Sequence, residues 1–488
     1  MKNCFRILIA AGILIFSNPL KAQNYNDALL LSEPGLYTGA RALSIGNSYT
    51  AISNDFSGVL FNPAGLGFIN KLQISTGFNL NSFDNQTNFF NTTTGAEKNS
   101  INLNQFGIVY PIPTVKGSWV FAIGYNRVKE FNRTMEFTGF NGSNNSMIRV
   151  LTGEVNDEIP ITNDLGLAFE IRDPQTELYI KDTTLINGML NQSGRIKKEG
   201  NLGNWSFSSS MEIAKGLMLG GTFNILTGTY KSDSDYWEDD TQDIYGAAIE
   251  LFPGDPSTRD FQSFYINDII EWELSGWDAK VGILYNWVNI LKFGATVKFP
   301  SIYTIKETFF VDAWSEFGTG AGYELDPKIV DKIQYEIQTP YEYSFGAAAN
   351  FWFATVSADI KVIDYTEMNF SEGFTTEYRI ARNREIEDLF ATTINYNFGA
   401  EVKVPSLPIW GRIGTMYFQS PFANDPGELD KKYLTVGAGI ELGHRFKIDA
   451  AYAFGWWEDF GDNYGENESR TFQDINVHHV VLNVTTQL

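Results

Sequence analysis

Apolar and polar residues alternate along many short segments of this chain, and this pattern restricts the possible folds more than any other feature. Apolar side chains occupy nearly every second position in 291–299, 354–362, 434–442 and 446–456. A period of two gives a β-strand one apolar and one polar face. The polar faces hold many Gly, Ser and Thr residues, and aromatic residues gather near strand ends, as in 452–457. The chain is therefore rich in strands that have two different faces.

Segments with this pattern number about 14, an even number, as the closure of an antiparallel barrel requires. Short links such as 443–445 alternate with long acidic links such as 232–243, which is the loop pattern of a transmembrane barrel. The aromatic content of 15% suits either a large β protein or a barrel with aromatic girdles. A soluble β-sandwich would also alternate, but the small residues on the polar faces, the aromatic residues at strand ends and the loop pattern favour a barrel. We therefore predict an all-β fold, an antiparallel transmembrane β-barrel. Its strands are expected to start near Leu72, Asn102, Ser118, Asn204, Gly216, Trp277, Asn289, Tyr343, Ala354, Thr392, Ile409, Tyr433, Arg445 and Asp474.

The first 22 residues have the three-part pattern of a secretory signal peptide. Lys2 and Arg6 precede an apolar run at 7–16, and Ala22 offers a small residue before the cleavage point. An uncleaved anchor helix is the alternative, but the apolar run is too short to span a membrane easily. Residues 1–22 are therefore predicted to be removed on export.

Charge, cysteine and histidine content argue against nucleic-acid binding and catalysis. The formal net charge is −22, and removal of the three cations of the signal peptide gives −22 − 3 = −25, whereas nucleic-acid binding needs a basic surface. Cys4, inside the signal peptide, is the only cysteine, so the mature chain has no disulfide and no thiolate metal site. His478 and His479 face opposite ways on a strand, and His444 lies in a turn. We predict a protein that is not an enzyme and has no cofactor or metal.

Residues 39–69 are rich in glycine, short of charge and without a helical or strand period. We interpret them as a compact irregular element inside the barrel, part of an N-terminal plug that covers 23–70. Pro63 fixes its own φ and pushes Asn62 into an extended conformation, while Gly65 is able to adopt a positive φ. A rigid turn is therefore predicted for the plug motif, which consists of Asn62, Pro63, Ala64 and Gly65.

The barrel is expected to cover 71–488 and to carry one long outer loop, 138–203, where the strand rhythm stops. Within this loop, Pro174–Gln192 can form a helix with one apolar side. Because loops this long are usually functional, we predict that this side captures ligand. The alternative is a loop that shields the barrel mouth without binding anything. The apolar side consists of Leu178, Leu185, Ile186, Met189 and Leu190.

Charged residues of both signs fall on the polar faces of the later strands. The simpler interpretation is a polar network that locks strands and plug together, and the alternative is a binding role. The acidic run at 233–243 could bind Ca²⁺, but it lacks the glycine-centred spacing of a calcium loop, so an outer loop is the better interpretation. The predicted lumen network consists of Asp359, Lys361, Arg412, Glu441, Lys447 and Asp449.

Four segments, 39–66 with its Asn62-Pro63-Ala64 motif, 277–300, 353–365 and 409–421, follow one another in a specific order and spacing. Together they resemble the long-chain fatty acid transporter family of outer-membrane proteins, which includes aromatic hydrocarbon channels and related proteins of Bacteroidetes-type bacteria. They are similar to the family's plug, its middle hairpin and its later strands, with Arg412 in the arginine–glycine position.

The resemblance implies a fourteen-stranded barrel with a plug, capture of ligand at the outer surface and lateral release beside a kinked third strand. In this chain the third strand is 118–137, and an interior glycine that weakens a ladder places the kink near 124–127. The lateral gate is therefore expected at Gly124, Tyr125 and Asn126.

The function implied is passive transport of hydrophobic compounds across the outer membrane. Long-chain fatty acids are the first expectation, and aromatic hydrocarbons or haem-like ligands are the next. An apolar ligand gains about 0.8 kcal/mol per buried CH₂, so a dry groove is able to extract it. The alternatives are a non-transporting barrel that serves as shuttle or anchor in protein secretion, and a general porin. Expected partners are a hydrophobic small molecule, outer-membrane lipid and the outer-membrane assembly machinery, for a monomeric barrel that binds no nucleic acid.

Overall fold

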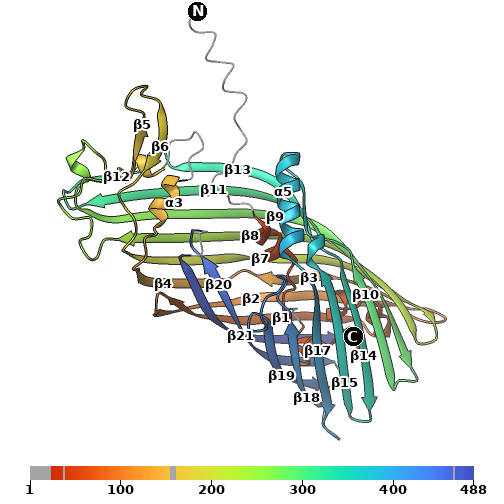
Figure 1. Cartoon of the computed structure of the whole chain (residues 1–488). Helices are drawn as coiled ribbons and strands as arrows, with labels where there is room; N and C mark the ends of the chain where they lie inside the picture. Colours follow the sequence, from red (N-terminus) through yellow and green to blue (C-terminus); the bar gives the residue numbers. More distant parts are fainter. Residues whose placement is uncertain (1–23, 37–38, 154–160, 444, 465–467) are drawn as a thin grey trace, which may run out of the picture.

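The computed structural model describes residues 24–36, 39–153, 161–443, 445–464 and 468–488. The predicted signal peptide and His444 lie outside these residues. The chain forms one closed antiparallel barrel, because β1 pairs with β2 on one side and with β21 on the other (Figure 1). The 14 wall strands are β1 (Gln73–Phe89), β2 (Thr92–Ile112), β3 (Trp119–Glu130), β7 (Leu190–Ala214), β8 (Leu217–Asp239), β9 (Phe261–Trp287), β10 (Leu291–Lys298), β14 (Glu342–Phe351), β15 (Ala354–Asp364), β17 (Thr392–Lys403), β18 (Ile409–Phe418), β19 (Lys431–Leu442), β20 (Phe446–Asp462) and β21 (Arg470–Gln487).

Several wall strands are continued beyond a break by a second strand. β4 (Arg133–Asn141) continues β3 and pairs with β7, and β11 (Ile302–Phe317) continues β10 and pairs with β9. β13 (Ile329–Gln338) and β16 (Asn369–Glu372) continue β14 and β15 in the same way. These continuations extend one side of the wall far beyond the rest of the barrel (Figure 1). The same end carries the long connections, including β12 (Gly322–Glu324) and the separate hairpin of β5 (Phe169–Arg172) and β6 (Tyr179–Thr183).

The alternation in the sequence becomes an outer and an inner face of the wall. In β8, for example, Leu219, Phe223 and Ile225 are exposed on the outside, whereas Thr222 and Asn224 are buried on the inside. Such an apolar exterior suits a hydrocarbon surrounding. The predicted antiparallel barrel is confirmed, and each of the fourteen expected starts lies inside a wall strand or within two residues of one.

Two predictions for the connections are wrong. The segment Pro174–Gln192 is not a helix, because it contains β6 and the start of β7, and Gly188 and Met189 have φ values of 115° and 57° that no α-helix allows. The acidic run at 233–243 is not mainly a loop, because β8 continues to Asp239. Its carboxylates are paired across strands, as between Arg195 and Asp235 at 2.8 Å.

Helices play a minor part in the fold. The long connection after β4 holds α3 (Met147–Gly153) and α4 (Ile161–Asp164), and α5 (Thr376–Leu389) follows β16. None of the helices among the described residues has the length and hydropathy required to cross a membrane. Inside the barrel lie α1 (Tyr25–Ser32), α2 (Ala40–Ser44), η1 (Phe56–Val59) and η2 (Pro63–Phe68), while η3 (Pro256–Thr258) and η4 (Tyr365–Glu367) lie in connections between strands.

Candidate functional site

Residues 39–69, called here the lumenal segment, lie inside the barrel and bond directly to the wall. The carboxylate of Asp359 on β15 accepts the backbone N–H groups of Tyr49 and Thr50, both at 2.8 Å. Ser118 and Ser210 donate hydroxyl hydrogens to backbone carbonyls of the segment at 2.7 and 2.9 Å. Hydrogen bonds from side chains of the wall strands therefore attach the backbone of the segment on several sides of the lumen.

Asn62 is the central residue of the predicted motif. Its side-chain oxygen accepts the N–H of Ala64 at 3.1 Å, and its side-chain nitrogen donates to the carbonyls of Thr50 at 2.9 Å and Ile283 at 3.1 Å. As predicted, Asn62 is extended, with φ −146° and ψ 105°. One side chain thus joins two parts of the lumenal segment to β9 of the wall.

The four motif residues do not form a turn with a positive φ at Gly65. Pro63 instead opens the short 3₁₀ helix η2, for which its fixed φ is suited. The glycine is needed for space, since a Cβ at Gly65 would lie closer than 3 Å to the backbone carbonyl of Ser53. The positive φ values of the segment occur at Gly46 and Asn47, with φ 64° and 54°.

Pairs of facing glycines let the lumenal segment lie directly on the wall. The ring of Phe56 rests on Gly107 of β2 and Gly124 of β3, and a Cβ at either glycine would lie closer than 3 Å to that ring. The same arrangement recurs around the lumen beneath Ile45, Thr50 and Pro63. The facing pairs are Gly107–Gly124, Gly220–Gly282, Gly294–Gly346 and Gly399–Gly414.

The predicted lumenal charges fall into separate clusters. Arg412 bonds to Glu401 at 2.6 Å and to Asp449 at 2.8 Å, and Lys447 lies 3.4 Å from Asp449. Arg41 of the lumenal segment joins this cluster through two 3.0 Å hydrogen bonds to Glu401. The first cluster therefore ties the segment to β17, β18 and β20.

The second cluster has Glu342 at its centre. Glu342 accepts from Lys361 at 3.0 Å and from Lys298 at 2.8 Å. Glu441 lies on the lumenal face of β19, opposite Lys447 in the β19–β20 ladder. Three of the six predicted members, Arg412, Lys447 and Asp449, thus meet in one cluster, while Lys361 belongs to the second. Glu401 and Glu342, which complete the two clusters, were not predicted from the sequence.

The third wall strand separates from β2 after Asn126 and ends at Glu130. Pairing between β3 and β2 ends at Asn126 and Gln105, whereas β2 stays paired with β1 as far as Thr92. The register of β3 against β7 shifts between Arg127 and Lys129. Among the described residues, the β3-side edge of β2 from 92 to 104 has no strand partner.

The predicted gate residues lie at the near side of this break. Gly124 and Tyr125 are still paired with β2, and Asn126 is the last paired residue. The stretch without a partner on β2 starts at Arg127, and the strand itself is interrupted between Glu130 and Arg133, beyond the glycine on which the prediction relied. Gly124 serves instead to admit the ring of Phe56.

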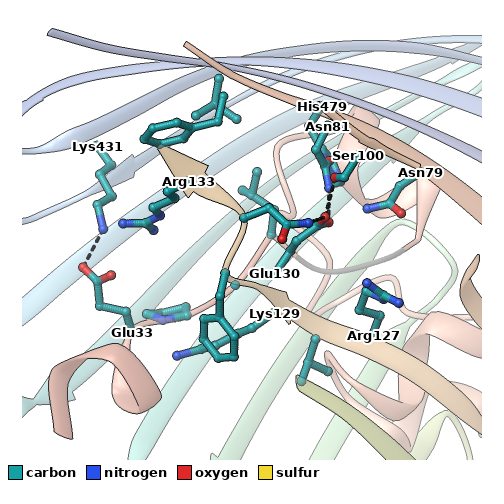
Figure 2. A pocket seen from close by; sticks show the side chains of 18 of the residues that line it. Glu33, Asn79, Asn81, Ser100, Arg127, Lys129, Glu130, Arg133, Lys431 and His479 are labelled. Carbon is teal, nitrogen blue, oxygen red and sulfur yellow. Dashed lines mark hydrogen bonds and ion pairs between the residues drawn. The ribbon is translucent and has the colours of Figure 1, made fainter. Parts of the chain in front are cut away.

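Glu130 connects the broken strand to its two neighbours. Its carboxylate accepts hydrogen bonds from Asn81 of β1 and Ser100 of β2, and from Asn102 of β2 at 2.9 Å (Figure 2). Asn132, on the same broken strand, donates to it at 2.6 Å. A carboxylate with several donors is a strong tie, so Glu130 holds the edge of β2 near the break.

A cavity of about 150 Å³ lies beside this break (Figure 2). A dry cavity of this size is able to hold a benzene ring. One part of the lining is polar and includes Glu130 and His479. The aromatic part of the lining is Phe83, Phe131, Phe418, Tyr433 and Trp457.

The N-terminal helix α1 and the residues after it close one side of the cavity. Lys129 donates to the last carbonyls of α1, those of Leu30 and Leu31, at 2.6 and 2.8 Å. Glu33 forms an ion pair with Lys431 at 2.5 Å. Burial opposes the ionisation of Glu33, but the charges of Lys431 and Arg133 outweigh it and hold the pKa of this carboxyl below its usual value.

Arg133 is a cation near the cavity that no carboxylate neutralises directly. Among the described residues its side chain has no hydrogen bond or ion pair, and its guanidinium lies 5.8 Å from the centre of the Phe83 ring. Figure 2 shows it next to Lys431. This corner of the cavity is therefore suited to an acidic head group.

The five predicted capture residues do not share a face. Ile186 and Leu190 are fully buried in an apolar cluster formed by the loops at the long-loop end of the barrel. Leu178 and Leu185 are 66% and 42% exposed, and Met189 lies in the turn between them and β7. Because the helix is absent, these five residues do not form one binding surface.

The cavity residues Glu33, Lys129, Glu130, Arg133 and His479 were missed by the sequence analysis. A signal for some of them was present, since charged residues at 127–133 interrupt the alternation of the third strand. Glu33 gave no such signal, because it comes from the N-terminal part of the chain and meets Lys431 only in the folded barrel.

No family model matches this sequence, and no curated protein matches it. Solved structures do resemble it. A FadL homologue of Pseudomonas aeruginosa is 12% identical with a TM-score of 0.56, over 93% of this chain and 99% of that chain. The toluene transporter TodX of Pseudomonas putida is 12% identical with a TM-score of 0.53, over 93% and 98%. A deltaS2S3 mutant of the TodX monoaromatic hydrocarbon channel is 13% identical with a TM-score of 0.55, over 93% and 99%. At these identities the likeness concerns the fold, and the chain therefore has the barrel fold of these channels.

Proposed function

We infer that the protein is a passive channel for hydrophobic compounds in the outer membrane, and a distant Bacteroidetes-type relative of the fatty acid and hydrocarbon channels. The observation that carries this inference is the cavity with aromatic lining directly beside a break in the barrel wall. A general pore would need an open lumen, whereas here the lumenal segment fills it. The neighbours described as hydrocarbon channels support the same function.

The route proposed here leads sideways through the wall. The lumenal segment acts as a plug that blocks the direct path to the end with the short turns. Cargo captured at the end with the long loops enters the cavity and leaves between β2 and the broken strand β3. A lateral exit suits an apolar compound, because it gains about 0.8 kcal/mol per CH₂ in hydrocarbon and avoids the polar lumen.

Two classes of cargo suit the cavity, the larger of them only with its chain extending beyond it. A long-chain fatty acid would place its carboxylate at Arg133 and Lys431, where a charge-assisted hydrogen bond is available. A monoaromatic hydrocarbon would occupy the aromatic part of the lining. Folding into the membrane as a monomer with the help of the outer-membrane assembly machinery belongs to the same proposal.

Uptake of labelled oleate and labelled toluene by cells with and without the protein tests the function. We expect faster uptake of at least one compound in cells that carry the protein. An Arg133→Met variant should slow oleate uptake and leave toluene uptake unchanged. Equal uptake of both compounds in both kinds of cell would contradict the proposed function.

A further inference from the structure

His479 lies on the lumenal face of β21 and lines the cavity beside the strand break (Figure 2). It is 6% exposed. Its Nδ1 is hydrogen-bonded to Oδ1 of Asn81, and Nδ2 of Asn81 donates to the carboxylate of Glu130. Because a carboxylate only accepts, Asn81 turns its amide nitrogen toward Glu130 and its carbonyl oxygen toward His479. The proton of neutral His479 is therefore on Nδ1, and Nε2 is an acceptor.

Two buried acceptors thus line the cavity without a donor. Within the described parts of the chain, nothing donates a hydrogen bond to Nε2 of His479 or to Oδ1 of Asn79. Asn79 is 5% exposed and lines the same cavity. A buried acceptor without a donor is unfavourable. These two positions therefore gain most from a ligand that brings an O–H group.

His479 lies apart from the cationic corner of the cavity. In Figure 2, Lys431 and Arg133 are on one side of Glu130, and His479 and Asn79 are on the other. A carboxylate would place its lone pairs against the two acceptors, and an ether or a plain hydrocarbon would leave them without a donor. A hydroxyl group is able to donate its one hydrogen to either acceptor while the rest of the molecule fills the aromatic part of the lining.

We propose that His479 and Asn79 form a polar subsite for hydrophobic compounds that carry a hydroxyl group, such as phenols and alcohols. The proposal rests on the proposed function, because it names a class of cargo for the same cavity. The relay from Glu130 through Asn81 fixes the tautomer of His479 and thereby selects a donor rather than an acceptor on the cargo.

Binding of three probes of nearly equal shape tests the subsite. 4-Ethylphenol, 4-ethylanisole and ethylbenzene are titrated into the purified barrel in detergent at pH 8, where a histidine is ordinarily neutral. We expect the phenol to bind about three- to tenfold more tightly than the anisole, as one net hydrogen bond allows. In His479→Phe the advantage of the phenol should shrink, because only Asn79 remains as an acceptor, and in the double variant His479→Phe with Asn79→Leu the two affinities should become equal. Ethylbenzene should bind to both variants as it binds to the unchanged protein.

His478→Phe is the matched control, because His478 is the neighbour of His479 on the outer face of β21, with its Nε2 3.5 Å from the carboxylate of Asp84. It should keep the full preference for the phenol. A His479→Gln variant retains a hydrogen-bonding side chain, so the preference should be partly kept there even if the phenylalanine variant fails to fold. ¹⁵N NMR of the imidazoles, in a chain with only 3 histidines, should show His479 protonated at Nδ1 alone.

The outcomes separate the subsite from the proposed function. If ethylbenzene binds but the phenol has no advantage in the unchanged protein, the subsite is wrong and the hydrophobic cavity stands. If the advantage is undiminished in His479→Phe, it does not come from His479, and the assignment fails. If none of the three probes binds, both the subsite and the proposed cavity for hydrophobic cargo are wrong.

Discussion

At the scale of single residues, space at the wall is as important as hydrogen bonding. Gly107 and Gly124 face each other across β2 and β3 and leave room for the ring of Phe56. Asn62 and Asp359 then fix the same lumenal segment by hydrogen bonds to its backbone. Small wall residues and polar anchors therefore act together, and each can be tested separately.

Gly107→Ala should destabilise the folded barrel. The new methyl group would overlap the ring of Phe56, and overpacking of this kind costs about 1–3 kcal/mol. Urea unfolding followed by the gel shift of the folded barrel measures the change. Gly95→Ala, also on β2 but with open space around it, should have almost no effect, and Phe56→Leu should relieve the Gly107→Ala variant. If Gly107→Ala and Gly95→Ala behave alike, the close packing is wrong.

Acid should release the N-terminal helix α1 from the cavity. The pKa of Glu33 is lower in the folded protein than its ordinary 4.5, so its ion pair contributes stability above that pH and the contribution is lost as the pH falls below it. Hydrogen exchange of residues 25–36 between pH 7 and pH 3 measures the release.

Lys431→Met is the control for this pH dependence. It removes the partner of Glu33, so the release should occur at higher pH than in the unchanged protein. Asp27, whose pKa is raised by burial, acts in the opposite direction in both proteins and therefore cancels in the comparison. Identical pH profiles for the two proteins would contradict the role of the ion pair.

At the scale of elements, the decisive feature is the interruption between β3 and β4. Ladder hydrogen bonds between β2 and β3 stop at Asn126, and side-chain bonds to Glu130 replace them. The carboxylate of Glu130 thus holds β2 beside the third strand, which backbone hydrogen bonds do elsewhere in the wall. Such a connection can open without unfolding a strand.

Glu130→Ala should loosen the free edge of β2. The loss of hydrogen bonds to a charged group, worth about 1.5–3 kcal/mol each, should raise amide exchange at 98–104 by about tenfold or more. Glu130→Gln keeps an acceptor and should have a smaller effect. Exchange in β15, none of whose residues lines the cavity, is the internal reference. Unchanged exchange at 98–104 in the alanine variant would show that Glu130 does not hold this edge.

Asn62→Ala should make the barrel leak ions. The carbonyls of Thr50 and Ile283 and the N–H of Ala64 would each lose a partner, at a cost of about 1–3 kcal/mol for each buried group left unsatisfied. Conductance of single barrels in planar bilayers measures the opening of the lumen. Pro63→Ala, which removes no hydrogen bond, should leak much less. If Asn62→Ala barrels conduct no more ions than the unchanged protein, Asn62 does not hold the plug in place.

At the scale of the whole molecule, the barrel could be predicted from alternation. Each residue of a strand faces either the outside or the lumen, so its polarity depends on that face alone and can be recognised in a short stretch of sequence. The charged and polar contacts of the cavity could not be predicted in this way. Glu33 and Lys431, or Asn81 and His479, are far apart in the sequence and meet only when the wall closes. The prediction of a helix at 174–192 was wrong for a related reason. β7 starts at Leu190 and is held as a strand by its pairing with β8, a contact that the local sequence does not show.

The glycines of the sequence predicted the lumenal segment but not its contacts with the wall. The segment 39–69 was recognised by its own glycines, but its fit depends equally on wall glycines such as Gly220 and Gly282, which face each other across two strands. Their pairing requires the strand register, which a sequence alone does not provide. The position of the break likewise follows from Glu130 and its partners on two other strands, and not from Gly124.

The central claim is that cargo leaves through the break beside β3. Because Cys4 is the only cysteine of the chain, a pair introduced as Ser100→Cys and Glu130→Cys can be bridged across the break by a reducible crosslinker. The control pair is Ser208→Cys and Thr222→Cys, whose native side chains lie 2.6 Å apart on the intact ladder of β7 and β8. Uptake of labelled oleate or toluene should stop when the first pair is bridged, return on reduction and remain unchanged for the control pair. Undiminished uptake with the break bridged would contradict lateral release.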